Sequence, residues 1–408
     1  MSSKNEPGEM SVAGASVAVP PFQQEPLLKP FDFQGDFSPY NFRRFLKHCA
    51  DHGVSDLTIQ GGDFVWAEIH GRQCPATLQT VKQGQFPTLI GALWGSEVES
   101  NIRSGKGADR ALELQGEDLG IDRGAYIRFR CNFVQARVAR LDEAYSITLR
   151  IIPSVLPDIL QMGIEPELFE AMYPGQGLVL VCGPTGSGKT TLQAGVYGFA
   201  GAQFPDRKVV TYEDPIEFVL GGSHWKGPQP SQSQIGRDIE TFALGLKNAM
   251  RRKPSIIGIG EARDLETMDA MIEAGLSGHL CYATLHTESV AETINRVIQV
   301  YPPAQQSAVA ARLMGALRVV VVQRLLKTTD GRRIAVREFE VFDRDLRNEL
   351  QSLPYERWAL ALRQRLEAAN ATLDDKAWAL YQAGRIDKEE FVELAGHKSF
   401  RERTGDEK

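Results

Sequence analysis

The sequence predicts an α/β protein with two folded domains, the second of which contains a mostly parallel sheet. Two patterns and the chain length carry this prediction. From residue 163 onward, apolar runs of strand length alternate with longer helix-compatible segments, which is typical of parallel strands joined by helices on both faces of a sheet. Before residue 150, strands and short helices mix in the manner of an α+β domain. A chain of 408 residues is also too long for one ordinary core.

The composition is that of a folded globular protein. Hydrophobic residues make up 42% of the chain, charged residues make up 24%, and the net charge is −6, which argues against a protein whose main role is to coat DNA or RNA. The five cysteines include no C-x-x-C pair, so neither a disulfide framework nor a zinc knuckle is expected. The scattered cysteines fit a reducing, cytoplasmic setting best. We expect no transmembrane segment, because no apolar run reaches the roughly 18 residues of a membrane span.

Composition and periodicity divide the chain into five parts. Residues 1–34 are rich in proline and predict a flexible tail. Residues 35–150 form the expected α+β domain, and residues 151–163 the linker that follows it. Residues 164–345 form the expected parallel-sheet domain. Residues 346–408 predict a C-terminal helical region, in which Asp387 and Glu390 resemble a capping box.

Local signals place the elements within these parts. Ser38 followed by Pro39 predicts the start of a helix whose apolar side chains fall on one face. A further helical region is expected over residues 86–102. The strands expected in the first domain cover residues 55–60, 65–70, 124–133 and 144–150. The strands expected in the second domain cover residues 178–182, 209–212, 256–260, 280–285 and 319–323.

The pattern G-x-x-x-x-G-K-T follows the apolar run of residues 177–182 and precedes a helix-compatible segment. In this context it predicts a P-loop, because its glycines let backbone N–H groups face phosphate oxygens at a helix N-terminus. Lys189 is expected on the β- and γ-phosphates and the Thr190 hydroxyl on Mg²⁺. The alternative is an ordinary glycine-rich turn. The predicted nucleotide-binding residues are Gly183, Pro184, Thr185, Gly186, Ser187, Gly188, Lys189, Thr190 and Thr191.

Carboxylates end two of the other expected strands. Glu213 follows the strand at residues 209–212 and can hold Mg²⁺ through water or polarise an attacking water, although solvated loop acids are the alternative. Glu261 ends the apolar run after Ser255, which is how P-loop enzymes place the carboxylate that orients or deprotonates water. We expect Thr190, Glu213 and Glu261 to hold Mg²⁺, mostly through water.

Further polar side chains stand near the expected strand ends or in the first domain, and the histidines and arginines among them have two interpretations each. His279 and His286 bracket a strand, which argues against a shared metal site and leaves either a sensor of the γ-phosphate or histidines bonded to backbone. Arg263 and Asp264 are expected to form a structural ion pair at a helix start. The arginines of the first domain are either ordinary surface residues or arginine fingers that reach the nucleotide. These arginines are Arg128, Arg130 and Arg150.

Residues 183–190, 212–217, 259–264 and 278–287, taken in this order, resemble the Walker A, Asp box, Walker B and His box of the secretion ATPases that include the pilus-retraction motor PilT. The resemblance covers residues 38–345. Two further stretches, 230–235 and 249–254, are most similar to the DotB branch, which includes the TraJ proteins of I-type conjugative plasmids.

This resemblance implies a hexamer in which a PAS-like domain lies over a RecA-like P-loop ATPase domain, with ATP and Mg²⁺ between them. It implies that Arg128, Arg130 and Arg150 are candidate γ-phosphate ligands and that His279 and His286 are the His-box pair. The implied function is ATP hydrolysis coupled to type IVB secretion or conjugal DNA transfer. Membrane-associated secretion or conjugation machinery, such as a coupling-protein complex, would recruit the protein to the inner membrane.

Three alternatives remain. A type IV pilus motor would share every catalytic residue. A nucleic-acid translocase would be stimulated by DNA, but the acidic net charge does not favour direct nucleic-acid binding. A nucleotide-binding scaffold without hydrolysis is disfavoured because Lys189, Thr190 and Glu261 are all present.

Overall fold

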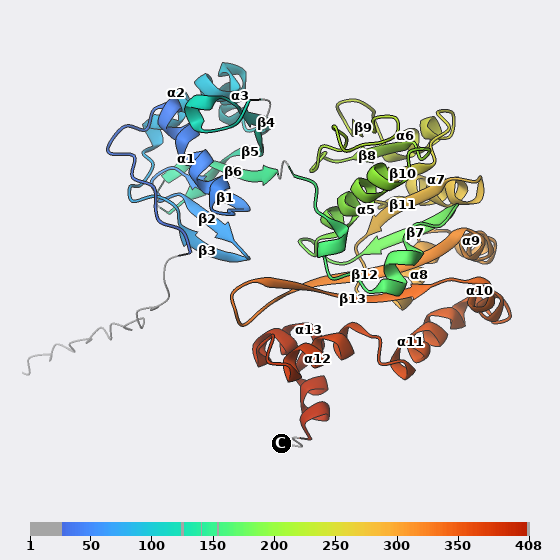
Figure 1. The fold of residues 1–408 in the computed structure, drawn as a ribbon. Helices are drawn as coiled ribbons and strands as arrows, with labels where there is room; N and C mark the ends of the chain where they lie inside the picture. The colour runs from blue at the N-terminus through green and yellow to red at the C-terminus, as the bar shows by residue number, and fades with distance from the viewer. Residues whose placement is uncertain (1–26, 124–125, 140, 153–154, 406–408) are drawn as a thin grey trace, which may run out of the picture.

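The structure is a computed structural model that describes residues 27–123, 126–139, 141–152 and 155–405. Two β-sheets with their helices lie side by side, and a group of C-terminal helices packs below the second sheet (Figure 1). The predicted α/β class is confirmed. Parts of four expected segments lie outside the described residues: 1–26 of the tail, 124–125 of the strand at 124–133, 153–154 of the linker and 406–408 of the C-terminal region.

The first sheet is antiparallel throughout and has the strand order β3-β2-β1-β6-β5-β4. The sequence does not predict β3 or β4. The expected strands at 124–133 and 144–150 correspond to two longer strands that pair along most of their length. The strands are β1 (Asp56–Gln60), β2 (Trp66–Ile69), β3 (Arg72–Pro75), β4 (Ala108–Leu114), β5 (Ile127–Val138) and β6 (Leu141–Ile152).

Helix α1 (Pro39–Asp51) begins as predicted, with the Ser38 hydroxyl accepting the N–H of Asn41 at 3.4 Å. Its buried face is the one expected from the sequence, and it packs into the core of the first sheet. The helical region expected over 86–102 is two helices, α2 (Phe86–Trp94) and α3 (Ser96–Arg103), because Gly95 between them has a φ of 93°, which interrupts the regular α-helical backbone.

The expected tail extends too far toward the first domain. Leu28 and Phe33 are buried in the core of the first sheet, and Phe31 forms a parallel β-bridge with Thr77. Residues 28–33 are therefore part of the folded unit, because their aromatic and aliphatic side chains outweigh the prolines that suggested a tail.

The second sheet has the order β13-β12-β7-β11-β10-β8-β9, and only the edge strand β13 runs antiparallel to its neighbour. The mostly parallel sheet predicted from the sequence is confirmed, although the sequence does not predict β9 or β13. The strands are β7 (Gly177–Cys182), β8 (Val209–Glu213), β9 (Ser231–Gln234), β10 (Ile256–Ile259), β11 (Leu280–Leu285), β12 (Leu317–Lys327) and β13 (Arg333–Val341).

Helices cover both faces of this sheet. The central strand β7 is buried throughout: Val179 and Val181 pack toward α5, while Leu178 and Leu180 pack toward the helices of the other face. The helices of this unit are α4 (Pro166–Ala171), α5 (Lys189–Gln203), α6 (Phe242–Ala249), α7 (Leu265–Leu276), α8 (Val290–Gln299) and α9 (Pro303–Ala316).

The C-terminal region is helical, as predicted, and it extends the core of the second sheet rather than forming a core of its own. Asp387 caps its last helix by accepting the N–H of Glu390 at 2.8 Å. The predicted capping box is wrong in its second half, because the Glu390 carboxylate accepts the N–H of Lys327 at 2.8 Å. The helices are α10 (Arg344–Gln351), α11 (Trp358–Ala368), α12 (Leu373–Gln382) and α13 (Lys388–Thr404), the last of which is kinked at Gly396, whose φ is 83°.

Within the described part of the chain, none of the helices is both long and apolar enough to cross a membrane.

Candidate functional site

A cavity of about 510 Å³ lies between the carboxyl ends of the parallel strands and the first sheet. Strands β7, β8, β10 and β11 all end at this edge, which is where ligands bind on open parallel sheets. The lining includes Glu68 and Arg150 from the first sheet together with Lys189 and Glu261 from the second. The residues of the predicted nucleotide-binding set that line it are Thr185, Gly186, Ser187, Gly188, Lys189, Thr190 and Thr191.

The predicted P-loop connects β7 to α5. Gly183 and Gly188 have φ values of 138° and 82°, and α5 begins at the next residue, Lys189. A side chain at Gly183 would overlap the backbone carbonyl of Gln323 in the neighbouring strand β12. Glycine is therefore required at this position both by its conformation and by its close packing.

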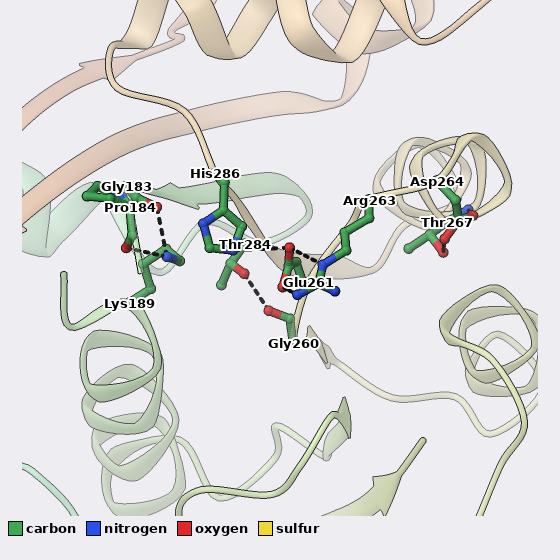
Figure 2. A network of polar contacts seen from close by, with 10 residues as sticks. All are labelled: Gly183, Pro184, Lys189, Gly260, Glu261, Arg263, Asp264, Thr267, Thr284 and His286. Carbon is green, nitrogen blue, oxygen red and sulfur yellow. Dashed lines mark hydrogen bonds and ion pairs between the residues drawn. The ribbon is translucent and has the colours of Figure 1, made fainter. Parts of the chain in front are cut away.

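Lys189 turns back onto its own loop. Its ammonium donates to the carbonyl of Gly183 at 2.7 Å and to that of Pro184 at 2.8 Å, as Figure 2 shows. Gly183 and Pro184 thus hold the lysine rather than line the cavity. Burial lowers the pKa of Lys189, while the charge of Glu261 partly opposes that shift. The ammonium is a compact donor at the bottom of the site, suited to an anionic ligand.

Glu261 follows β10 at the sheet edge and holds two cationic or polar partners. The Arg263 guanidinium donates to both carboxylate oxygens, with its Nη2 at 2.6 Å from Oε2. His286 Nε2 lies 3.1 Å from Oε1 (Figure 2). Burial raises the pKa of Glu261, but Arg263 and His286 outweigh that effect and leave it below its usual value. The carboxylate is therefore ionised at neutral pH, as a general base must be.

Thr284 fixes the backbone on both sides of Glu261. Its hydroxyl donates to the carbonyl of Gly260, and its own carbonyl accepts the N–H of Ala262 at 3.0 Å. Thr284 is not among the site residues predicted from the sequence. Its position two residues before His286, at the carboxyl end of β11, is the signal that would have pointed to it.

The expected ion pair between Arg263 and Asp264 is wrong. Asp264 instead caps α7, accepting the N–H of Thr267 at 2.8 Å and its hydroxyl at 2.9 Å. The cap position draws the aspartate toward the helix and leaves Arg263 free to turn to Glu261 (Figure 2).

Glu213 lies deeper in the cavity wall, at the end of β8. The hydroxyl of Thr211 donates to its carboxylate at 2.5 Å, and Gln232 donates at 2.9 Å. Burial raises the pKa of Glu213 above its usual value, although these two donors oppose the shift. The environments of the two predicted carboxylates therefore shift their pKa values in opposite directions, upward for Glu213 and downward for Glu261.

A protein-family model described as "Type II/IV secretion system protein" matches residues 120–354, more than half of the chain. The chain belongs to this family of secretion system proteins.

Known members resemble it over nearly its whole length. The type IV pilus retraction ATPase PilT of Pseudomonas aeruginosa is 30% identical over 351 residues, which cover 86% of this chain and 96% of that protein. The structure of the Legionella pneumophila ATPase DotB matches with a TM-score of 0.82 and 32% identity over 90% of this chain and 98% of that one. The pilus retraction motor PilT with bound ADP matches with a TM-score of 0.71 and 27% identity, covering 88% and 98%.

These likenesses confirm the predicted architecture of this secretion system protein. A RecA-like P-loop ATPase domain is preceded by a PAS-like α+β domain and followed by C-terminal helices. Parts of all four motifs, which are far apart in the sequence, meet at one edge of the second sheet, because each includes residues that follow the carboxyl end of a strand there.

Two of the three arginines predicted in the first domain of this secretion system protein reach the cavity. Arg130 and Arg150 are register partners on β5 and β6, and both line the cavity. Arg150 Nε donates to Asp56 at 2.8 Å, and its Nη1 lies 3.8 Å from Glu217. Arg128, two residues from Arg130 along β5, is not among the lining residues.

The two histidines of the predicted His box are separated. His286 follows β11 and contacts Glu261, whereas His279 precedes β11 at the opposite edge of the sheet, where its ring nitrogen lies 3.2 Å from the Ser277 hydroxyl. A strand of six residues separates the two rings, so only His286 belongs to this cavity.

Three charged residues that the first sheet and β13 bring to the cavity of this family member were not identified from the sequence. Asp56 and Glu68 are register partners on β1 and β2, and Arg333 at the start of β13 reaches Glu68 at 3.3 Å. Isolated acidic and basic residues on surface strands carry no motif, and only the sheet register brings them to the site.

Proposed function

We propose that this chain hydrolyses ATP to ADP and phosphate with Mg²⁺. The observation that carries the proposal is one cavity shared by Lys189, Glu261 and Arg150, an ammonium, an ionised carboxylate and a guanidinium from three separate elements. Phosphoryl transfer to water needs these three parts: charge on the phosphates, a group that orients the water, and a cation for the transition state.

The P-loop fits a triphosphate. The buried Ser187 hydroxyl oxygen has no hydrogen-bond partner within the described residues, and Lys189 is satisfied only by loop carbonyls that phosphate oxygens would replace. Thr190 would bind Mg²⁺ through its hydroxyl, with Glu213 and Glu261 acting through water. That division fits the described side chains, since no group of three or more histidine, cysteine or acidic residues among them could hold a metal by itself.

Hydrolysis would be linked to movement of the first sheet against the second. Arg150 is held by Asp56 and Glu217, and a γ-phosphate would compete for it with a higher charge density. Loss of phosphate would return Arg150 to its carboxylates, which is the kind of order change that nucleotide motors use. His286, which contacts Glu261, would respond to a change in the charge or position of that carboxylate. His279 and Arg128 remain predictions without a contact in this cavity.

We further propose a cytoplasmic hexamer that drives type IVB secretion or conjugal DNA transfer, recruited to the inner membrane by that machinery. The likeness to DotB supports this machine. The type IV pilus motor is the second candidate, supported by the 30% identity to PilT. The division into residues 35–150, 151–163, 164–345 and 346–408 is proposed on the same grounds, with residues 28–33 added to the first part.

Two measurements test these proposals. Phosphate release by the wild-type protein is compared with that of Glu261→Gln, which we expect to lower turnover by about 10²- to 10⁴-fold. Equal rates would contradict the proposed reaction.

Affinity purification of the Glu261→Gln variant from its native host tests which machine the protein serves. Recovery of conjugation or type IVB components supports the proposal, and recovery of pilus components in their place contradicts it.

A further inference from the structure

A buried polar chain crosses the second sheet from the P-loop to the segment that joins the two sheets. Its middle members, Gln323 and Arg337, are register partners on the antiparallel pair β12 and β13. They are 3% and 2% exposed. Gln323 follows the last residue of β12 that pairs with β7, so it lies where the P-loop leaves the sheet.

Gln323 holds the P-loop at one end of this chain. Its Nε2 donates to the carbonyl of Ser187 at 2.7 Å. A side chain at Gly188 would lie 2.9 Å from that same nitrogen, and one at Gly183 would overlap the Gln323 backbone carbonyl. The loop therefore rests on Gln323 without intervening space, and a shift of the Ser187 peptide must move the amide or break its hydrogen bond.

Arg337 holds the connecting segment at the other end. Its Nε donates to Gln323 Oε1 at 2.8 Å, and its other nitrogens donate to the carbonyls of Gly163 at 3.1 Å and Met162 at 3.2 Å. Glu165 supplies a counter-charge at 3.6 Å. The rigid guanidinium fork fixes these three directions at once, which a lysine or an apolar side chain cannot do.

Packing alone does not explain why an arginine occupies the buried position 337. A buried charge carries a large desolvation penalty, and apolar residues of similar volume often stabilise such sites equally well or better. What the guanidinium adds is a fixed geometry between three segments that are far apart in the sequence: residues 162–163, the P-loop and β12.

We propose that Gln323 and Arg337 form a relay that couples nucleotide occupancy of the P-loop to the segment joining the two sheets, which makes Arg337 a positioning residue for domain movement. The inference rests on the proposed function because it takes the P-loop ligand to be ATP. Beyond that function, the inference names the side chains through which ATP binding at Ser187 would change the position of Met162 and Gly163.

Gln323→Glu is the sharpest test because it keeps the shape and the acceptor for Arg337 but removes the donor to the Ser187 carbonyl. Arg337→Met removes the hydrogen bonds from the guanidinium to Gln323 and to the carbonyls of Met162 and Gly163. Arg365→Met is the control: it deletes an arginine that pairs with a carboxylate of β13, Glu340 at 3.0 Å, away from the cavity and from the Gln323–Arg337 contacts. The readout is hydrogen exchange of backbone amides over residues 156–165, with and without a non-hydrolysable ATP analogue.

We expect the analogue to slow exchange over residues 156–165 in the wild type and in Arg365→Met, and to leave it unchanged in Gln323→Glu and Arg337→Met. Turnover should fall about 2- to 30-fold in both relay variants, with the KM for ATP changed less than about twofold. Because the two residues act in series, the double variant should lose no more than either single one.

A nucleotide-dependent change that persists in Gln323→Glu overturns the relay, as does a double variant whose loss is the product of the two single losses. If Arg337→Met does not fold, the isosteric Gln323→Glu still decides. Wild-type protein that binds the analogue without hydrolysing ATP contradicts only the proposed function, whereas failure to bind it at all overturns both.

Discussion

The ionisation of Glu261 depends on side chains that a nucleotide would have to rearrange. Arg263 and His286 both contact its carboxylate and hold its pKa below the usual value against the effect of burial. Arg263 is largely exposed, with 75% of its side chain accessible, so it is free to move while Glu261 is not. The pair keeps the proposed base charged before substrate arrives.

Arg263→Gln should move the acid limb of the turnover profile to higher pH. Removing the guanidinium raises the pKa of Glu261, so at a given acidic pH less of the carboxylate is ionised and turnover is lower than in the wild type. The measurement is ATP turnover as a function of pH. Arg237→Gln, which breaks an exposed pair with Asp238 outside the cavity, is the control. An unchanged acid limb in Arg263→Gln would remove Glu261 from the role of base.

Lys189→Ala and Glu261→Gln should separate binding from hydrolysis. Lys189→Ala should weaken ATP binding by about 10- to 100-fold, because charge-assisted bonds to phosphate are lost. Glu261→Gln should bind ATP like the wild type. Fluorescent nucleotide titration of both variants gives the comparison, and an equal loss of affinity in the two would contradict the separate roles.

Single residues are predictable where a motif and a strand end coincide. Lys189, Glu261 and His286 meet this condition, and all three are brought to the cavity. The partner of Arg263 was wrongly predicted because the Asp264 carboxylate caps helix α7 by accepting the N–H of Thr267. Arg263 pairs with Glu261 instead. No periodicity could have indicated that choice.

Among the elements, strands buried on both faces were predictable and polar edge strands were not. The continuous apolar run of β7 is diagnostic, since helices cover both of its faces. Strand β9 is half-buried and wholly polar, and β13 carries buried charges at Arg337, Glu338 and Glu340. Those side chains are satisfied by partners distant in sequence, so the strand shows no apolar alternation.

Phe391→Ala should destabilise the C-terminal helices. Phe391 is fully buried and lies 5.3 Å from the ring of Trp378 and 5.9 Å from that of Phe400, so the cavity left behind should cost about 3–5 kcal/mol of unfolding free energy. Denaturant unfolding followed by circular dichroism measures this.

Leu360→Ala in helix α11 is the matched control, because Leu360 is 56% exposed. It should change the unfolding free energy by less than about 0.5 kcal/mol. Comparable stability of the two variants would mean that the aromatic cluster does not hold helices α12 and α13 together.

At the scale of the whole molecule, the first sheet presents a row of charged side chains to the cavity. Its register aligns Glu68, Asp56, Arg150 and Arg130 across four neighbouring strands, and Arg333 from β13 pairs with Glu68. The sequence could suggest arginines in the first domain, but only the register ranks them.

Arg150→Ala and Arg130→Ala should each lower ATP turnover by about 10-fold or more, because the proposed transition-state charge would lose a cation. Arg128→Ala should have a smaller effect, since Arg128 does not line the cavity. Steady-state phosphate release at saturating ATP ranks the three. A loss in Arg128→Ala that exceeds the other two would contradict the assignment.

The proposed secretion motor is tested most directly by ATP hydrolysis across size fractions of the purified protein, with and without single- and double-stranded DNA. We expect phosphate release confined to a hexamer-sized fraction and unchanged by DNA, because the proposed motor acts as an assembled hexamer and the acidic chain does not favour nucleic acid. Strong stimulation by DNA would contradict the secretion motor in favour of a translocase, and absence of hydrolysis in every fraction would contradict the proposed reaction itself.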